Sequence, residues 1–305
     1  MQAYPLNVMQ ELNDINLESK YAELKKIISS YGSVIVAFSG GVDSTLVARA
    51  TYDVLAERTI AVTIRSESLS RTACSRAMKL SSEIGIRHII VKIDKLSKKE
   101  YRINNFDRCY HCKSMDAHIL KKVADQHGID TIIDGVNTDD MKDYRPGLRA
   151  FDMYNVKHPL YQLGFNKILI RKLAKSVGLS NADLPADSCL SSRITYLEAI
   201  DEEKLNRIEK SEEFIKSLGF SNVRVRDVTG SARIELPEAE ISGLFEKEMC
   251  KTISNHLKSL GFRYVTVDLE GLKHGSMNRI IDAKKKTFQT SSQAPSFSSS
   301  HDHQP

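Results

Sequence analysis

The 305-residue sequence lacks the features that would place it in a membrane or outside the cell. No apolar run approaches the roughly 20 residues that a membrane-spanning helix needs. The N-terminus also lacks the basic, apolar and small-residue succession of a signal peptide. Five cysteines are an odd number and do not suggest a disulfide framework. We therefore expect a cytoplasmic protein with no membrane association, whose cysteines serve metal, cluster or thiol chemistry.

Long blocks of one charge are also missing. The formal net charge is +5, and the charged residues, 27% of the chain, are spread along it. A mild positive excess suits an anionic small molecule as well as nucleic acid. A dense patch of Lys and Arg interleaved with aromatic residues is absent, which makes nucleic acid the less favoured partner. With 41% hydrophobic residues, the chain can bury the core of one large or two medium domains.

Hydrophobic periodicity predicts an α/β fold for residues 1–186. Short β-branched runs alternate with segments of helical composition, which is typical of a doubly wound parallel sheet. The expected strands are 34–38, 60–64, 88–93 and 131–134, and the expected helices are 20–31, 42–55, 70–84, 115–127 and 168–177. Ligands of such sheets bind at the carboxyl ends of the strands. Residues 39–44 and 134–140 fall at this edge.

The pattern changes after Pro185 and predicts a smaller α+β domain over residues 187–283, which we expect to bind substrate and to support a homo-oligomer. Its expected elements are a charged helix at about 198–218, a hairpin of 223–228 and 232–236, two helices, and a strand at 264–269. Residues 284–305 are rich in Ser, Gln, Pro and His and have almost no aliphatic side chains, so we expect a disordered tail.

The strand at 34–38 ends in the hexapeptide Ser-Gly-Gly-Val-Asp-Ser. Two glycines let the backbone turn sharply and bring its N–H groups against a phosphate at a helix N-terminus. A carboxylate at Asp43 suits such a loop if it holds a magnesium ion that bridges the phosphates. The alternative is an ordinary strand-to-helix turn with a polar cap. The predicted ATP-binding residues are Ser39, Gly40, Gly41, Asp43, Ser44 and Thr45.

This hexapeptide is not a Walker motif, because the Gly-Lys-Ser/Thr ending is absent. It resembles the PP-loop of N-type ATP pyrophosphatases, and the resemblance implies adenylyl transfer with pyrophosphate as the leaving group. A second motif, Gly-Val-Asn-Thr-Asp-Asp at 135–140, follows the strand at 131–134. Its carboxylates, Asp139 among them, could complete the magnesium site. A solvated acidic turn is the alternative.

Three cysteines have informative positions. Cys109 and Cys112 form a CxxC pair, a spacing that lets two thiolates converge on one metal or cluster. A zinc half-site, a redox dithiol and two packed thiols remain alternatives for the pair alone. Cys189 lies in a polar segment, for which we predict a loop and an accessible thiol. Three thiols suit an iron-sulfur cubane with one iron free for an exogenous ligand.

The motifs together resemble the LarE family of ATP-dependent sulfurtransferases over about residues 17–281. They occur in the order SGGVDSTL, DRCYHCK, GVNTDDMKDYRPGLRA, ADSCLSSRI, VRVRDVTGSARIEL and LGFRYVTVDLEGLKHGSMN. The resemblance implies adenylation of a carboxylate of pyridinium-3,5-biscarboxylic acid mononucleotide and its conversion to a thiocarboxylate, in the synthesis of the nickel-pincer nucleotide cofactor. Other proteins of that synthesis are implied partners.

The resemblance also implies that Cys189 handles the sulfur. In one branch of the family this cysteine gives up its own sulfur and becomes dehydroalanine. In the other branch it joins a CxxC pair to bind a four-iron four-sulfur cluster that carries an extra sulfide. Because Cys109, Cys112 and Cys189 are all present, the sequence resembles the cluster branch.

Three arginines are predicted to bind the phosphate of the substrate. Arg224 and Arg226 alternate along a predicted strand and so lie on one face, and Arg193 follows Cys189 by four residues. Ordinary surface charge is the alternative for each. Glu209, Glu212 and Glu213 share one face of the charged helix, which we interpret as solvated; a second cation site near the substrate is the alternative.

Other functions fit parts of the pattern. A PP-loop tRNA thiolase also uses a three-cysteine cluster, but an appended RNA-binding domain is absent. An amide synthetase would need an ammonia source, and the sequence contains no glutaminase-like segment. A non-catalytic nucleotide sensor would bind ATP without releasing pyrophosphate.

Overall fold

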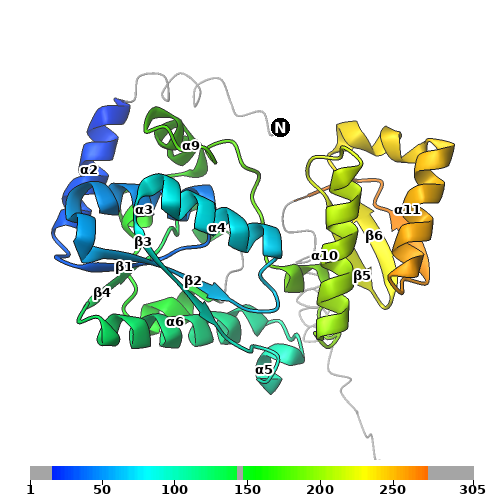
Figure 1. Cartoon of the computed structure of the whole chain (residues 1–305), viewed down its shortest axis with the longest axis horizontal. Helices are drawn as coiled ribbons and strands as arrows, with labels where there is room; N and C mark the ends of the chain where they lie inside the picture. Colours follow the sequence, from blue (N-terminus) through cyan, green and yellow to red (C-terminus); the bar gives the residue numbers. More distant parts are fainter. Residues whose placement is uncertain (1–15, 143–146, 274–305) are drawn as a thin grey trace, which may run out of the picture. The chain divides into compact units, whose positions relative to one another are not determined.

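The computed structural model describes residues 16–142 and 147–273 (Figure 1). The expected tail at 284–305, with His301 and His303, lies outside the described residues. Two sheets are present, one of four strands and one of three. None of the described helices is long and apolar enough to span a membrane. The domain boundary expected after residue 186 stays a prediction.

The first sheet is parallel and has the order β3-β2-β1-β4. Its strands are β1 (Val34–Ala37), β2 (Thr59–Arg65), β3 (Arg87–Lys92) and β4 (Thr131–Ile133). The chain runs outward from β1 through β2 to β3 and then returns to add β4 on the other side. The carboxyl ends of β1 and β4 therefore flank the point where the strand order reverses, which is where ligands bind in such sheets.

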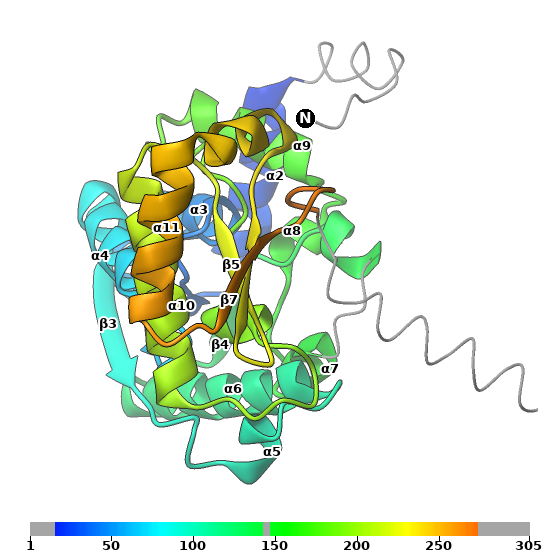
Figure 2. The same cartoon turned by 90° about the vertical axis from the view of Figure 1, so that its right-hand side faces the viewer.

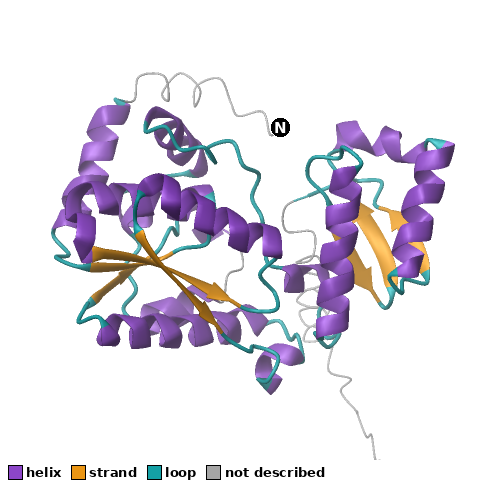
Figure 3. Cartoon of the chain, in the orientation of Figure 1, coloured by secondary structure: helices purple, strands orange, loops and turns teal. Residues whose placement is uncertain are grey.

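Helices cover both faces of this sheet, as Figure 3 shows. Val34 and Val36 of β1 belong to a core with α3 (Val42–Leu55) and α9 (Lys167–Ser176), whereas Ile35 between them belongs to a core with α6 (Arg108–Gln126). All three side chains are fully buried, as expected for a parallel strand with both faces covered. The prediction of a doubly wound parallel α/β fold is confirmed.

Several helices begin where polar side chains satisfy free backbone N–H groups. Asn16 caps α2, Ser70 caps α4 and Asn166 caps α9, each by accepting a hydrogen bond from the third residue after it. The helices around the first sheet are α2 (Leu17–Ser29), α3 (Val42–Leu55), α4 (Arg71–Ile84), α5 (Lys99–Arg102), α6 (Arg108–Gln126), α7 (Gly147–Met153), α8 (Pro159–Gln162) and α9 (Lys167–Ser176).

The second sheet has the order β5-β6-β7, with β5 (Arg224–Val228) antiparallel to β6 (Ser231–Glu235) and β7 (Tyr264–Val267) parallel to β6. The hairpin turn at Thr229 and Gly230 has positive φ at both residues, as a type I′ turn requires. Helices α10 (Glu202–Ser217) and α11 (Lys247–Ser259) pack with this sheet around a third core (Figure 2). Asp201 caps α10.

Two helices differ from expectation. Helix α6 begins at Arg108 instead of residue 115, because the N–H groups of Tyr110 and His111 already bond to the carbonyl of Asp107. The CxxC pair therefore lies in the first turns of a helix. One of the two helices expected between β6 and β7 is the 3-10 segment η4 (Glu238–Phe245). Three further 3-10 turns are η1 (Ala56–Arg58), η2 (Thr138–Lys142) and η3 (Leu190–Arg193).

We predict that Gly135→Ala disturbs the start of α3. A Cβ at Gly135 would lie 2.7 Å from the backbone nitrogen of Ser44, so backbone must move. The free energy of unfolding should fall by about 1–3 kcal/mol, measured by denaturant titration. Gly243→Ala is the control, since its Cβ would lie 3.5 Å from the Phe220 ring, an ordinary contact. Equal stability of the two variants would contradict the close packing.

Candidate functional site

The loop between β1 and α3 engages the N–H groups of Ser39 and Gly41 with its own hydroxyls, but it leaves the start of α3 uncapped by side chains. Gly40 has φ +71, and a Cβ there would lie 3.0 Å from the Cα of Ala77, so the position needs glycine on two counts. The N-terminus of α3 has no side-chain cap among the described residues. Its first N–H groups can therefore bind a phosphate.

Hydroxyl groups hold the loop in shape. Ser44 and Thr45 donate hydrogen bonds to the carbonyl of Gly41, at 3.1 and 2.9 Å, and the hydroxyls of Ser39 and Ser44 lie 3.1 Å apart. The predicted ATP residues are thus brought together in one turn. Their arrangement suits a triphosphate, although their roles stay a prediction.

The carboxylate of Asp43 is the centre of a charged group. Lys167, the first residue of α9, forms a short ion pair with Asp43 Oδ2, and the amide of Asn137 donates to Oδ1 at 3.4 Å. Asp139 accepts a hydrogen bond from the backbone N–H of Lys167 at 2.8 Å. The two carboxylates predicted for magnesium therefore meet around one lysine.

Lys167 was missed in the sequence. The sequence does contain a signal for this residue. A lysine in the first turn of a helix lies at the positive end of the helix dipole, which is unfavourable unless an anionic partner is nearby. Carboxylate oxygens have the right chemistry for Mg²⁺. However, the described residues contain no group of three or more Cys, His, Asp and Glu side chains placed to hold a metal ion.

The two cysteines of the CxxC pair have different surroundings. The buried ammonium of Lys95 donates to Cys112 Sγ at 3.0 Å and pairs with Asp116 at 2.6 Å. Burial, followed by the charge of Asp116, raises the pKa of the Cys112 thiol to about 11, against the opposing effect of Lys95. The Cys109 sulfur lies 3.6 Å from the guanidinium of Arg108.

Cys189 is exposed and immediately precedes η3. The segment after it is held by the region that carries the CxxC pair: Arg108 donates to the carbonyl of Ser191 at 2.9 Å, and the hydroxyl of Tyr101 bonds to that of Ser191. Burial, followed by the charge of Cys189, raises the pKa of Tyr101. Burial lowers the pKa of Arg108, but the charges of Cys109 and Cys189 outweigh it, and the pKa is raised. The segments of the three cysteines are therefore neighbours, but their thiols are not arranged as a metal site.

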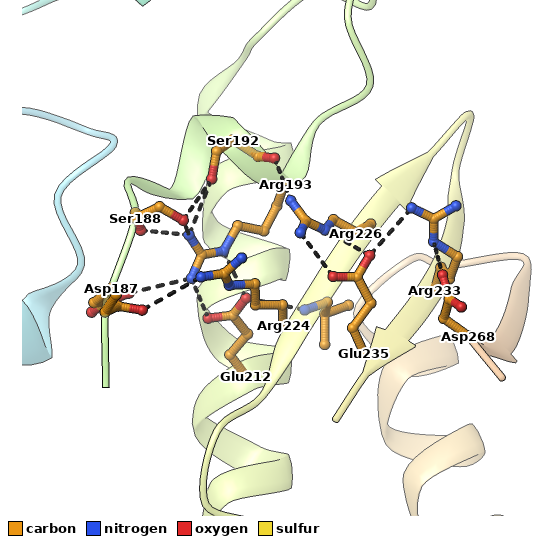
Figure 4. Close-up of polar contacts among 12 residues, drawn as sticks. Asp187, Ser188, Ser192, Arg193, Glu212, Arg224, Arg226, Arg233, Glu235 and Asp268 are labelled. Carbon is orange, nitrogen blue, oxygen red and sulfur yellow. Dashed lines mark hydrogen bonds and ion pairs between the residues drawn. The ribbon is translucent and has the colours of Figure 1, made fainter. Parts of the chain in front are cut away.

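Two of the three predicted arginines are paired with buried carboxylates (Figure 4). Arg193 donates to Glu212 at 2.9 Å and to the carbonyl of Cys189 at 3.0 Å. Arg226 binds both oxygens of Glu235, at 2.9 and 2.8 Å, and donates to the carbonyl of Ser192. Through the bonds to these two carbonyls, the paired arginines hold the segment that contains Cys189 and Ser192.

Arg224 differs from the other two. None of the described carboxylates lies within ion-pair distance of its guanidinium, which donates to the carbonyl of Ala186 at 3.4 Å. Burial, together with the neighbouring charges of Arg193 and Arg226, lowers its pKa to about 10. It remains a cation at neutral pH. Arg224 is therefore the member of this cluster best suited to an added anion.

The interpretation of the glutamates on α10 as a solvated face is wrong for two of them. Glu209 and Glu212 are buried. Glu209 accepts a hydrogen bond from the backbone N–H of Arg71, and Glu212 pairs with Arg193 and with the N–H of Val225. Only Glu213 retains a largely exposed side chain, at 42%.

Known proteins resemble this chain over almost all of its length. A family model described as NAD synthase matches residues 17–110. An uncharacterized protein of Synechocystis is 39% identical over 265 residues, which are 87% of this chain and 99% of the relative. The pyridinium-3,5-bisthiocarboxylic acid mononucleotide synthase of Lactiplantibacillus plantarum is 36% identical over 89% of this chain and 99% of its own. An uncharacterized protein of Methanocaldococcus jannaschii is 31% identical over 84% and 93%, respectively.

We predict that Cys112 resists alkylation at neutral pH. Its thiol pKa of about 11 leaves it almost entirely protonated at pH 7, and the thiolate is the reactive form. Labelling of the metal-free protein with iodoacetamide, followed by peptide mass spectrometry, should show Cys112 reacting only as the pH rises toward 11. The exposed Cys189 is the internal control. Modification of both at equal rates at pH 7 would contradict this assignment.

Proposed function

Because the chain belongs to the LarE family and is an ATP-using enzyme of the PP-loop class, we propose that it transfers sulfur to pyridinium-3,5-biscarboxylic acid mononucleotide in nickel-pincer cofactor synthesis. The full-length similarity to the named synthase carries this proposal. The glycine loop before α3, the exposed Cys189 and the cationic Arg224, which has no ion pair among the described residues, support it, since each supplies one requirement of the reaction.

In the first step, a substrate carboxylate oxygen attacks the α-phosphorus of ATP and pyrophosphate leaves, which gives an acyl adenylate. The N–H groups at the start of α3 would bind the phosphates. Asp43 and Asp139 are the proposed ligands of Mg²⁺, which would offset the phosphate charge. Lys167 already pairs with Asp43, so the metal and this lysine would share one carboxylate. With the metal bound, the ammonium of Lys167 would instead donate to a phosphate oxygen.

In the second step, a sulfur nucleophile attacks the acyl carbon and AMP leaves. If Cys189 is the nucleophile, its thiolate forms a thioester. Loss of the Cα proton and cleavage of the Cβ–S bond then yield the thiocarboxylate and dehydroalanine. The exposure of Cys189 suits this attack, because the thiol is accessible to a substrate of this size.

The other proposed sulfur source is a four-iron four-sulfur cluster held by Cys109, Cys112 and Cys189. The donor chemistry fits, because three thiolates leave one iron for an added sulfide, which the cluster would supply to the acyl carbon. Lys95 and Arg108 lie against the CxxC sulfurs and would offset the negative charge of such a cluster. Closure of the three thiols around it requires rearrangement of the described residues.

Turnover in the presence of MgATP and the substrate tests the proposal. After anaerobic reconstitution with iron and sulfide, the wild-type protein should release pyrophosphate and AMP and form the thiocarboxylate. Asp43→Asn should release none. An intact Cys189 after several turnovers supports the cluster route, and a Cys189 lighter by one H₂S supports the sacrificial route.

Other outcomes of the same experiment would contradict the proposal. Binding of ATP without pyrophosphate release would indicate a nucleotide sensor. Pyrophosphate release that requires tRNA and ignores the pyridinium mononucleotide would indicate a tRNA thiolase.

Arg224→Gln should weaken binding of the substrate phosphate. A hydrogen bond to a charged group contributes roughly 1.5–3 kcal/mol, so KM for the mononucleotide should rise about 10- to 100-fold while KM for ATP is unchanged. Arg263→Gln, which removes an exposed arginine immediately before β7, is the matched control. Equal effects of the two substitutions on KM would show that Arg224 does not bind the phosphate.

A further inference from the structure

Asn181 is a buried amide that contacts the phosphate loop from a distant part of the sequence. It lies in the turn that follows α9, and its side chain is 6% exposed. Its Nδ2 donates to the carbonyl of Gly40 at 3.2 Å and to Thr45 Oγ1 at 3.0 Å. None of the sequence motifs includes this residue, and neither step proposed above uses it.

The turn that carries Asn181 is rigidly attached to the rest of the domain. Leu179 and Ala182 are buried in the core that also contains α3. The guanidinium of Arg171 on α9 donates to the carbonyls of Ala182 and Leu184, at 2.7 and 2.6 Å. The amide of Asn181 is therefore presented to the loop from a fixed support.

The orientation of this amide follows from its surroundings. The carbonyl of Gly40 can only accept a hydrogen bond, so the nitrogen of Asn181 must face it. The buried Oδ1 then accepts no hydrogen bond from the described residues. An acceptor left in this state costs free energy. At this position, the two hydrogen bonds donated by Nδ2 are therefore kept although Oδ1 accepts none from the described residues.

The two hydrogen bonds brace both peptide units of the glycine turn. One fixes the carbonyl of Gly40, which lies in the same planar unit as the N–H of Gly41. The other reaches Thr45, whose hydroxyl donates to the carbonyl of Gly41 at 2.9 Å. Gly40 has a positive φ, and glycine gives this turn little stiffness of its own. Asn181 therefore adds an external brace to the hydrogen bonds that the hydroxyls of Ser39 and Ser44 make within the loop.

We propose that Asn181 is a positioning residue for ATP, which holds the Gly40–Gly41 turn in the form that directs N–H groups to the phosphates. This rests on the use of ATP by the loop and not on the identity of the sulfur acceptor. Asn181 does not itself touch the reacting atoms. Its contribution is to remove alternative loop conformations before the nucleotide binds.

The test is MgATP binding by Asn181→Asp. The two side chains have nearly the same shape, but the carboxylate has no N–H donors and repels the carbonyl of Gly40. Titration calorimetry on the full chain should show the dissociation constant of MgATP raised about tenfold or more. In pyrophosphate exchange, KM for ATP should rise while KM for the mononucleotide is unchanged. Asn206→Asp, the same charge change on the exposed side of α10, should alter neither value.

A purely structural role predicts a different result, because loss of folded protein lowers the maximum rate and leaves KM for ATP unchanged. That result in Asn181→Asp would overturn the proposal. If this variant does not fold, Asn181→Ser decides, since its shorter hydroxyl cannot span both acceptors and should also weaken MgATP binding. Wild-type affinity in a folded Asn181→Ser would overturn it as well. Failure of the wild-type protein to bind MgATP would instead remove the proposed use of ATP and the inference with it.

Discussion

The close approach of backbone segments around the glycine turn is the constraint on which the site depends. Gly40 packs against Ala77 of α4, and Gly135 at the end of β4 packs against the first turn of α3. A Cβ at either position would lie too close to backbone atoms. The segments that follow β1 and β4 therefore pack directly against α4 and α3, respectively. This packing places the acidic motif after β4 beside Asp43. A phosphate bound at α3 would therefore lie near Lys167 of α9 and near two candidate metal ligands, Asp43 of α3 and Asp139 of η2.

Charge compensation organises the region around Cys189. Arg193 with Glu212 and Arg226 with Glu235 are buried pairs, and their remaining donors bind carbonyls of residues 188–192. Breaking a buried pair is costly because it leaves one charge uncompensated. These arginines therefore act as fixed supports for the cysteine segment. Arg224 lies among them without a comparable carboxylate partner in the described residues, and its positive charge is the part of the cluster open to a ligand.

Much of the fold could be predicted because its signals are local. The alternation of β-branched strands with helical segments identified the parallel sheet, and the Ser39–Ser44 hexapeptide marked the loop at its carboxyl edge. The start of α6 was placed too late, since the CxxC segment has no strong apolar period. The glutamates of α10 were interpreted as solvated because helical spacing identifies which residues share a face, but not what covers that face.

The sequence by itself determined the class of fold and the position of the glycine loop after β1, because both depend on residues that lie close together in the chain. Only the tertiary structure decided which charges and amides meet. Lys167 reaches Asp43 across 124 positions and Asn181 reaches Gly40 across 141. Such pairs form when the packing of α9 and its following turn against α3 brings distant segments together. The periodicity of the sequence reports only on residues that are neighbours in the chain, so the contacts of Lys167 and Asn181 can be identified only from the three-dimensional structure.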